Sequence, residues 1–396
     1  MSGPASGLNK PRHSMSRHTT GEGSPLVPER FRFIRPTLPP LSRVLALYER
    51  AYADGLVTNG GLVRRFEDAV AERLGVKHCV AVSSCTCGLA LVFKALDIRG
   101  EVILPSLTFF ATGHALLWNG LKPVFADCDP ATWTLDPADV ESRITRRTAA
   151  ILAVHLYGNP CDTEPLEGIA RRHGIKLVFD AAHAFGSRHN GRPVGGFGDA
   201  EVFSLSPTKL LVAGEGGLVT TNDAVLANRL RAGRNYGDLG NYDPELLGLN
   251  ARMTEYSAAL GLAGLEILDQ KVCRYNELAA RYTRQLATLR GLTFQKIRAG
   301  DVSTFKDYSI VVDARAFGIG RDELARRLLE ENIETKKYFH PPLHELKLYR
   351  RFHGRGRAGL PNTGRISTGV LSLPIYDALP EETIDAVALA IRSATH

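Results

Sequence analysis

The chain has 396 residues and a net charge of +7, and its hydrophobic content of 44% and charged content of 23% are those of a globular protein with a large buried core. No apolar run approaches the roughly 20 residues that a membrane helix needs, and the N-terminus lacks the apolar stretch of a signal peptide, so we expect a cytoplasmic protein without membrane contact. The basic residues are scattered and form no run typical of nucleic-acid binding.

The N-terminal tail and the cysteines set further limits. Residues 1–30 are polar, which predicts a disordered tail. The six cysteines show neither CxxC pairs nor the Cys/His spacing of zinc or iron–sulfur sites, so we expect reduced thiols and no bound metal. Cys85 and Cys87 admit a redox interpretation, but small residues packed at a helix start are the simpler account.

Secondary structure follows from the spacing of apolar residues. Helical spacing predicts helices at 40–53 and 61–74, and short apolar strands then alternate with helices. The expected strands are 78–82, 101–104, 123–126, 149–154 and 176–179, and the expected helices are 87–96, 111–119 and 163–173. Unbroken apolar strands separated by helices indicate an α/β fold, a mostly parallel sheet with helices on both faces.

The pattern changes near residue 252. Two long helices are expected at 253–268 and 274–289, followed by one strand and two helices, at 308–312, 321–330 and 381–391. Strands are sparse in this part of the chain, which predicts a smaller α+β domain. We therefore expect a large domain at 31–264 and a small C-terminal domain at 265–396.

Ligands of open parallel sheets bind at the carboxyl ends of the strands, so the loops after the strands are the places to search. The first loop, 83–86, places hydroxyl residues at a helix start, which suits a phosphate; the alternative is a plain N-cap. In the next loop, the ring of Phe109 could lie against a heteroaromatic ligand, although an aromatic residue after a strand is often part of the core.

Two later loops carry an acid and a lysine. Asp180 closes an apolar strand, and a buried acid needs a cationic partner such as a protonated pyridine nitrogen; the alternatives are a helix cap and a structural salt bridge. Lys209 precedes the glycine-rich segment 214–217, and a lysine amine of lowered pKa forms Schiff bases with aldehydes. The alternative for Lys209 is a solvated surface group. The order of anion loop, aromatic ring, acid and lysine favours a site for an aldehyde cofactor.

Several longer motifs occur in one order along the chain, among them TNGGLVRRFE (58–67), EVILPSLTFFAT (101–112), FDAAHAFGS (179–187), DAEVFSLSPTK (199–209) and GEGGLVTTND (214–223). With these motifs the chain, from about Phe31 to near its C-terminus, resembles the DegT/DnrJ/StrS family of fold-type I sugar aminotransferases, which depend on pyridoxal 5′-phosphate (PLP). Within that family it is most similar to the 4-aminotransferases that act on dTDP-4-keto-6-deoxyglucose.

The resemblance implies roles for residues around the cofactor ring. Lys209 matches the lysine that holds the cofactor covalently, and Asp180 matches the partner of the pyridine nitrogen. Phe109 matches the aromatic residue stacked on the ring. His183 occupies a position, often Gln, that contacts the ring hydroxyl.

The resemblance also implies a phosphate site. The backbone at Cys85, together with Thr86 and Ser204, matches the phosphate cradle. Asn250 matches an asparagine that reaches the phosphate from the neighbouring subunit, which implies a homodimer with shared active sites. Two departures from the family pattern stand out: Cys85 where glycine or alanine is frequent, and Ser206 where histidine is usual.

The implied activity is a ping-pong transfer of an amino group from L-glutamate to a keto group of a nucleotide-linked deoxysugar, of the kind used for antibiotic deoxysugars and surface polysaccharides. The segment 336–344 resembles a substrate-facing loop in which Lys336, Lys337 or His340 would suit a diphosphate. Its alternative is a Pro-rich surface loop.

Three other functions are weighed against this one. Related sugar dehydratases, which use the same cofactor, carry histidine at the position of Lys209, so the lysine argues against them. A keto-cyclitol aminotransferase of aminoglycoside pathways would use the same chemistry and stays open. A non-catalytic binding or regulatory protein of this fold would be expected to lose the lysine or Asp180, or to add a DNA-binding domain, and the sequence shows neither change.

Overall fold

The computed structural model describes residues 30–353 and 359–394. The predicted disordered tail lies outside the described residues except for Arg30. Within the two described ranges, none of the helices is long and apolar enough to cross a membrane.

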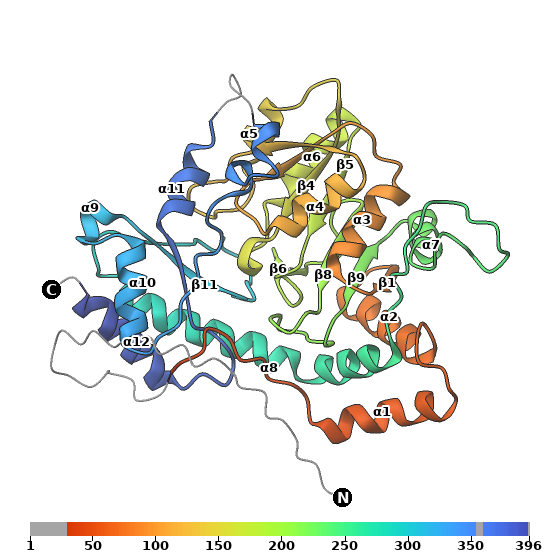
Figure 1. The fold of residues 1–396 in the computed structure, drawn as a ribbon, viewed down its shortest axis with the longest axis horizontal. Coiled ribbons are helices and arrows are strands. Elements are labelled where there is room, and N and C mark those ends of the chain that lie inside the picture. The colour runs from red at the N-terminus through yellow and green to blue at the C-terminus, as the bar shows by residue number, and fades with distance from the viewer. Residues whose placement is uncertain (1–29, 354–358, 395–396) are drawn as a thin grey trace, which may run out of the picture.

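A seven-stranded sheet forms the centre of the larger part of the molecule (Figure 1). Its strands lie in the order β1-β9-β8-β5-β4-β2-β3. They are β1 His78–Val82, β2 Glu101–Pro105, β3 Lys122–Ala126, β4 Thr148–Val154, β5 Lys176–Asp180, β8 Ala200–Ser204 and β9 Gly217–Thr221. Only β9 runs antiparallel to its neighbours in this sheet. The carboxyl ends of the other six strands therefore share one edge of the sheet, as the expected mostly parallel sheet requires.

The strands are apolar on both sides because helices cover both faces. Along β4, Ala150 and Leu152 pack into one core with three helices, whereas Ile151 and Ala153 pack into the opposite core. The first core includes α3 Cys85–Ala95, α4 Phe110–Trp118 and α7 Ala224–Gly233. The second includes α1 Leu41–Ala53, α2 Gly61–Leu74, α5 Pro137–Ser142, α6 Thr163–His173 and the long helix α8 Glu255–Leu286. This arrangement confirms the α/β layered fold expected from the sequence.

The expectation of two long helices at 253–268 and 274–289 is wrong, because α8 is one unbroken helix (Figure 1). The segment 269–273 between the two expected helices contains no proline or glycine to end a helix. Lys271 is buried, and its amine donates hydrogen bonds to the Leu210 carbonyl at 2.6 Å and the Thr37 carbonyl at 2.9 Å. The polar side chain thus has partners inside the fold, and the helix continues past it.

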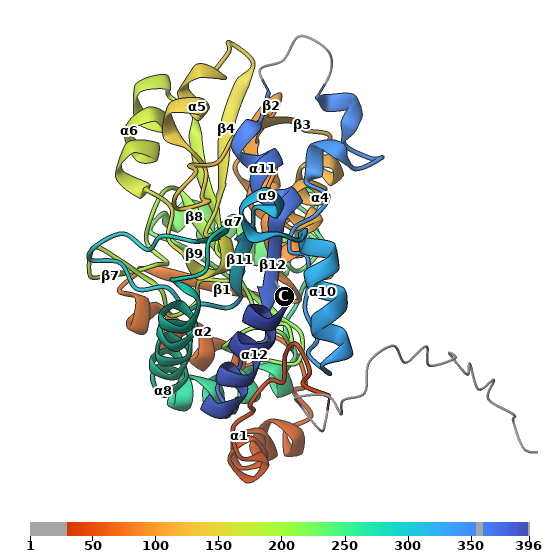
Figure 2. The same ribbon diagram turned by 90° about the vertical axis from the view of Figure 1, so that its left-hand side faces the viewer.

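A second, three-stranded antiparallel sheet lies beside the C-terminal part of α8 (Figure 2). It consists of β10 Leu292–Phe294, β11 Tyr308–Val312 and β12 Val370–Leu373, with helices α9 Ala314–Phe317, α10 Arg321–Glu330, α11 Pro361–Gly369 and α12 Glu381–Ser393. Short 3-10 turns occupy Leu156–Gly158, Leu343–Glu345 and Arg350–Phe352, and β6 Arg188–His189 pairs with β7 Arg192–Pro193. The expected domain boundary at 264/265 falls inside α8, and the division into domains stays a prediction.

Glu255 joins the start of α8 to the start of α2. Its buried carboxylate accepts hydrogen bonds from the backbone N–H groups of Gly60, Leu62 and Val63, at 2.7, 2.7 and 3.1 Å. These N–H groups lie at a helix N-terminus, where the helix itself offers no acceptors and negative charge is favoured. The carboxylate therefore fixes α2 against α8.

Candidate active site

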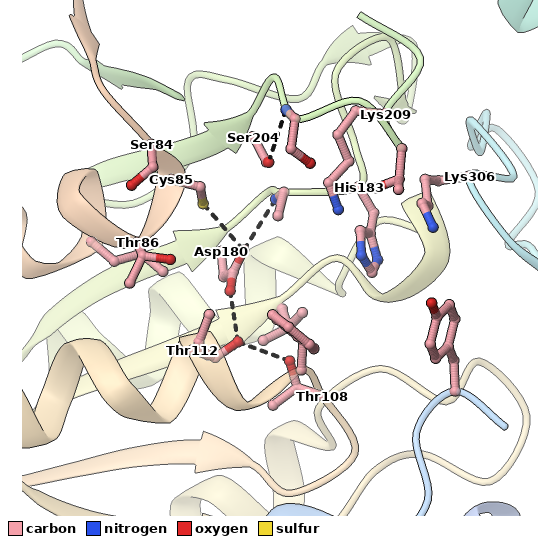
Figure 3. A pocket seen from close by; sticks show the side chains of 18 of the residues that line it. Ser84, Cys85, Thr86, Thr108, Thr112, Asp180, His183, Ser204, Lys209 and Lys306 are labelled. Carbon is pink, nitrogen blue, oxygen red and sulfur yellow. Dashed lines mark hydrogen bonds between the residues drawn. The ribbon is translucent and has the colours of Figure 1, made fainter. Parts of the chain in front are cut away.

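One cavity of about 340 Å³ opens at the sheet edge where the carboxyl ends of the strands meet (Figure 3). Seven of the eight residues predicted for the site line it: Cys85, Thr86, Phe109, Asp180, His183, Ser204 and Lys209. They come from the last residues of β5 and β8 and from the loops and helix starts that follow β1, β2, β5 and β8. The parallel sheet therefore brings together residues that lie far apart in the sequence.

The start of α3 forms one wall of the cavity. Ser84 is the N-cap, and its hydroxyl accepts a hydrogen bond from the N–H of Cys87 at 3.1 Å. The backbone N–H groups of Cys85 and Thr86 lie in the first turn of α3, where the helix has no carbonyl oxygen to accept their hydrogen bonds. A side chain at Gly217 would bring a Cβ atom within 2.6 Å of the Cys85 nitrogen. Glycine at 217 thus keeps open a backbone anion site at a helix N-terminus.

Asp180 lies at the end of β5 and is 5% exposed. Its Oδ2 accepts a 2.7 Å hydrogen bond from the hydroxyl of Thr112, and its Oδ1 accepts a 3.1 Å bond from the N–H of Ala182 (Figure 3). Burial raises the pKa of the Asp180 carboxyl, whereas these hydrogen bonds and the nearby Lys209 act in the opposite direction. The carboxylate is held in one orientation, facing the cavity.

Lys209 projects into the same cavity from the loop after β8 (Figure 3). Desolvation lowers the pKa of its amine to about 8, and the positive charge of Lys306 acts in the same direction. Asp307, Cys85 and Asp180 oppose this shift. A larger neutral fraction near neutral pH makes the amine a competent nucleophile toward an aldehyde.

His183 has one tautomer that fits its contacts. Its Nδ1 accepts a hydrogen bond from the N–H of Tyr157 at 3.1 Å, so in the neutral ring the proton sits on Nε2. Burial, with smaller contributions from Lys209 and Lys306, holds the pKa of the imidazole well below its usual value. His183 is therefore a neutral ring that can donate a hydrogen bond through Nε2.

Two charged residues of the cavity were missed by the sequence analysis. Lys306 and Asp307 are 4% and 2% exposed, and the lysine amine donates a 2.7 Å hydrogen bond to the Asp307 carboxylate. They directly precede β11, in the C-terminal part of the chain. The only sequence signal for these two residues is a pair of opposite charges directly before an apolar strand. Their place in the cavity could not be predicted, because it depends on how the two sheets pack.

Thr112 and Thr108 were also missed, and they form a second group in the cavity. The two hydroxyls lie 2.9 Å apart, and Thr112 in turn donates to Asp180. Both threonines belong to the motif EVILPSLTFFAT, but nothing in its sequence marks them as partners of an acid 68 residues away. The contact follows from the adjacency of α4 to the end of β5.

The segment 336–344 reaches the cavity with its aromatic residues. Tyr338 and Phe339 line the cavity, whereas Lys336, Lys337 and His340 are not among its lining residues. Lys337 pairs with Asp322 at 2.5 Å. The loop thus faces the cavity as the resemblance implies, but through rings rather than through the three basic residues considered for a diphosphate.

Asn250, the eighth predicted residue, lies outside this cavity. It is exposed, and its backbone forms a bridge with Asn235 at the base of the loop that follows α7. Exposed apolar side chains gather on the same loop, namely Tyr236, Leu239, Tyr242, Leu247 and Leu249. Within one chain, therefore, Asn250 does not complete the anion site.

The geometry agrees with comparisons to known proteins. The model of the DegT/DnrJ/EryC1/StrS aminotransferase family matches residues 43–392. The chain belongs to this family. Members of the DegT family depend on PLP, so this DegT-family member is a PLP-dependent aminotransferase, and the resemblance found in the sequence is confirmed.

Relatives of this DegT-family aminotransferase match along nearly their whole length. The dTDP-4-amino-4,6-dideoxy-D-glucose transaminase of Shigella dysenteriae is 33% identical over 90% of this chain and 97% of that protein. The spore coat polysaccharide biosynthesis protein SpsC of Bacillus subtilis is 35% identical over 85% of this chain and 90% of that protein. The crystal structure of DesI in the presence of its TDP-sugar product has a TM-score of 0.89 and 41% identity, covering 94% of this chain and 95% of that one.

The cavity of this DegT-family aminotransferase fits the cofactor. The backbone site at Cys85 and Thr86 suits the phosphate, because both residues line the cavity at a helix N-terminus and Gly217 keeps a side chain away from the Cys85 N–H. The buried Asp180 suits a protonated pyridine nitrogen, and the amine of Lys209 suits the aldehyde. The phosphate, the pyridine nitrogen and the aldehyde of PLP thus each have a counterpart of matching chemistry in one cavity.

Proposed function

We propose that this aminotransferase moves an amino group from L-glutamate to the keto group of a nucleotide-linked deoxysugar, with a dTDP-4-keto-6-deoxyhexose as the preferred acceptor. The observation that carries the proposal is the 41% identity and near-complete overlap with DesI, whose structure was determined in the presence of its TDP-sugar product. The transaminase of Shigella dysenteriae, named for dTDP-4-amino-4,6-dideoxy-D-glucose, supports the same sugar class.

Lys209 is proposed to hold the cofactor and to move the proton during transfer. When bound, PLP supplies an electron sink that stabilises negative charge on the substrate carbon. The Lys209 amine, with its lowered pKa, removes a proton from that carbon in the donor and returns one to the sugar carbon. A neutral amine is needed for the first step and a protonated amine for the second, and a pKa of about 8 makes both forms accessible near neutral pH.

Asp180 is proposed to keep the pyridine nitrogen protonated. Thr112 donates a hydrogen bond to one carboxylate oxygen of Asp180 and Ala182 donates to the other. These bonds fix the side chain and oppose the effect of burial on the pKa of Asp180. A buried carboxylate without a cationic partner is costly, so the protonated nitrogen and Asp180 stabilise each other. His183 donates through Nε2 to the ring hydroxyl oxygen in this proposal, and Phe109 covers the ring.

The phosphate is proposed to lie against the N–H groups of Cys85 and Thr86 and the hydroxyl of Ser204. Asn250 would come from a second copy of the chain. The exposed apolar side chains on the loop of Asn250 support a homodimer, because such a group on one loop is more favourable when covered. Each cavity would then be completed by the loop of the other subunit.

Glutamate as the donor is supported by the buried charge in the cavity. The ammonium group of Lys306 lines the cavity, and its hydrogen bond to Asp307 holds it there. The lysine ammonium has three donors, so the carboxylate of an anionic amino acid could accept a further charge-assisted hydrogen bond from Lys306 while Asp307 keeps its own. A donor with a neutral side chain offers only its α-carboxylate, whereas glutamate offers a second carboxylate for this contact.

The proposal is tested by running the transfer in reverse. A panel of dTDP-, GDP- and UDP-linked amino sugars, together with an amino-cyclitol, is incubated with 2-oxoglutarate, and glutamate formation is measured. We expect the fastest formation with dTDP-4-amino-4,6-dideoxyglucose and none with the Lys209→Ala variant. Turnover of an amino-cyclitol but of no nucleotide-linked sugar would contradict the proposal and favour the keto-cyclitol alternative.

A further inference from the structure

Three side chains with metal-ligating atoms meet on the surface of the part of the chain that the structure describes. Asp162, Glu164 and His189 each present one such atom within 4.8 Å of the others. Asp162 and Glu164 lie at the N-terminal end of α6, and His189 lies on β6, in the hairpin formed with β7 (Figures 1 and 2). None of the three lines the cofactor cavity.

His189 has a nitrogen that is oriented for a ligand. The side chain is only 3% exposed, and its Nδ1 lies 2.8 Å from Oδ1 of the fully buried Asp301. An ionised carboxylate only accepts hydrogen bonds, so Nδ1 carries the proton and Nε2 of the neutral ring has a free lone pair. Nε2 is buried and has no hydrogen-bond partner among the described residues, and its nearest charged neighbour is Glu164 at 3.7 Å.

The backbone holds this arrangement in place. Asn190 and Gly191 adopt positive φ angles of 48° and 78°, as a tight hairpin turn requires. Arg188 and Val302 exchange two backbone hydrogen bonds of 2.9 Å, which places Asp301 beside His189. The N–H of Asn190 also donates to Asp301 at 3.0 Å. The orientation of the imidazole ring is therefore determined before any ligand binds.

The charges around His189 favour a cation. Asp162 is the N-cap residue of α6, but its side chain makes no capping hydrogen bond. Arg298 lies close to this cluster, with its Nε 3.7 Å from the carboxylate of Asp162. Glu164 also accepts a weak 3.4 Å hydrogen bond from the Asn190 amide. Three carboxylates, those of Asp162, Glu164 and Asp301, thus lie around His189, and Arg298 pairs with one of them.

We propose that Asp162, Glu164 and Nε2 of His189 bind a divalent first-row cation such as Zn²⁺, with water completing the coordination. One imidazole nitrogen and two carboxylate oxygens form a ligand set that suits such ions. Asp301 orients the ring through Nδ1, the arrangement in which a carboxylate supports a metal-bound histidine. The cation would connect the start of α6 to the β6–β7 hairpin and to the segment that carries Asp301.

This site departs from the absence of metal expected from the sequence. That expectation rested on cysteine spacing, and the proposed site contains no cysteine. Glu164 and His189 are separated by 25 positions, a spacing that matches no familiar zinc motif. Only the fold brings them together.

Zinc binding to the full-length holoenzyme tests the proposal. Protein treated with a chelator is dialysed against ZnCl2 of known free concentration, and bound zinc is measured by mass spectrometry of the metal. The variants are Glu164→Gln, which alters an exposed side chain that packing does not require, and His189→Ala. The matched control is His173→Ala, because His173 also lies 3.7 Å from a glutamate but has no buried carboxylate behind it.

We expect wild-type protein and His173→Ala to bind one more zinc ion per chain than His189→Ala, and Glu164→Gln to bind that ion at least about tenfold more weakly. Zinc should also raise the Tm of wild-type protein and of the control, but not of His189→Ala. Equal zinc binding by all four proteins would overturn the proposal, and so would wild-type protein that binds no more zinc than His189→Ala.

Discussion

The amine of Lys306 donates a 2.7 Å hydrogen bond to the carboxylate of Asp307 inside the cavity that also contains Lys209. Two lysines thus share one buried site, and only one of them has a carboxylate partner. The charge of Lys306 lowers the pKa of Lys209, and Asp307 partly offsets this effect. The pair therefore sets how readily Lys209 loses its proton.

Removing the charge of Lys306 should raise the pKa of Lys209. In Lys306→Met the pKa should rise from about 8 toward 10.5, the ordinary value for lysine, because one cause of the lowering is lost and Asp307 no longer has a partner. Below that pKa the neutral fraction of the amine falls about tenfold for each unit of increase. The rate at which apo-protein regains bound PLP, measured from pH 6 to about pH 10, should therefore shift its midpoint to higher pH. The exposed Lys347→Met is the control, and an unchanged midpoint in Lys306→Met would contradict the prediction.

Thr112 should matter for catalysis through Asp180. Its hydroxyl helps to keep the Asp180 carboxyl ionised, so Thr112→Val should raise the pKa of Asp180 and weaken its pairing with the pyridine nitrogen. A hydrogen bond to a charged group contributes about 1.5–3 kcal/mol, which corresponds to a loss of at least about tenfold in kcat. Thr112→Ser keeps the hydroxyl and should retain most activity. Equal kcat values for the two variants would show that the hydroxyl has no such role.

The residues that follow strands in sequence were predictable, because parallel strands bring their carboxyl ends to one edge. Asp180, Ser204 and Lys209 follow that rule, and the structure places all three in one cavity. Lys306 and Thr112 do not follow it. Lys306 enters from the second sheet and Thr112 from a helix face, and neither position is set by local sequence.

The fold shows the same division between local and non-local information. Apolar periodicity predicted five of the seven strands of the large sheet, β1 to β5, and most of the helices that cover it, since both are local patterns; α5 and α7 were not assigned. It failed at Lys271, where a polar residue inside α8 finds carbonyl partners contributed by Thr37 and Leu210. The strands β8 and β9 were also not assigned, and the antiparallel direction of β9 is seen only in the structure.

Glu255 should be important for stability rather than for chemistry. Glu255→Gln keeps the shape of the side chain but replaces an accepting oxygen with a donor that faces backbone N–H groups of α2. Leaving buried donors without acceptors should lower the free energy of unfolding by about 3 kcal/mol. Urea titration should show the change, and the exposed Glu49→Gln in α1 is the control. Equal unfolding midpoints for the two variants would contradict this role.

A shared active site predicts complementation between two inactive variants. Lys209→Ala lacks the proposed cofactor lysine, and Asn250→Ala lacks the proposed phosphate contact from the second subunit. In a mixed dimer, one cavity combines an intact Lys209 with the intact Asn250 of the other chain. Co-expression of the two variants should therefore give activity well above that of either alone. Activity no higher than the average of the separate variants would contradict a shared site.

The central claim is that Lys209, and not its neighbour Lys306, holds the cofactor. Reduction of the holoenzyme with borohydride makes the bond between cofactor and lysine permanent, and mass spectrometry of the digested protein then locates the added mass. We predict that the mass appears on the peptide that contains Lys209 and is absent from it in Lys209→Ala. Added mass on the peptide that contains Lys306, or on no lysine of the cavity, would contradict the account.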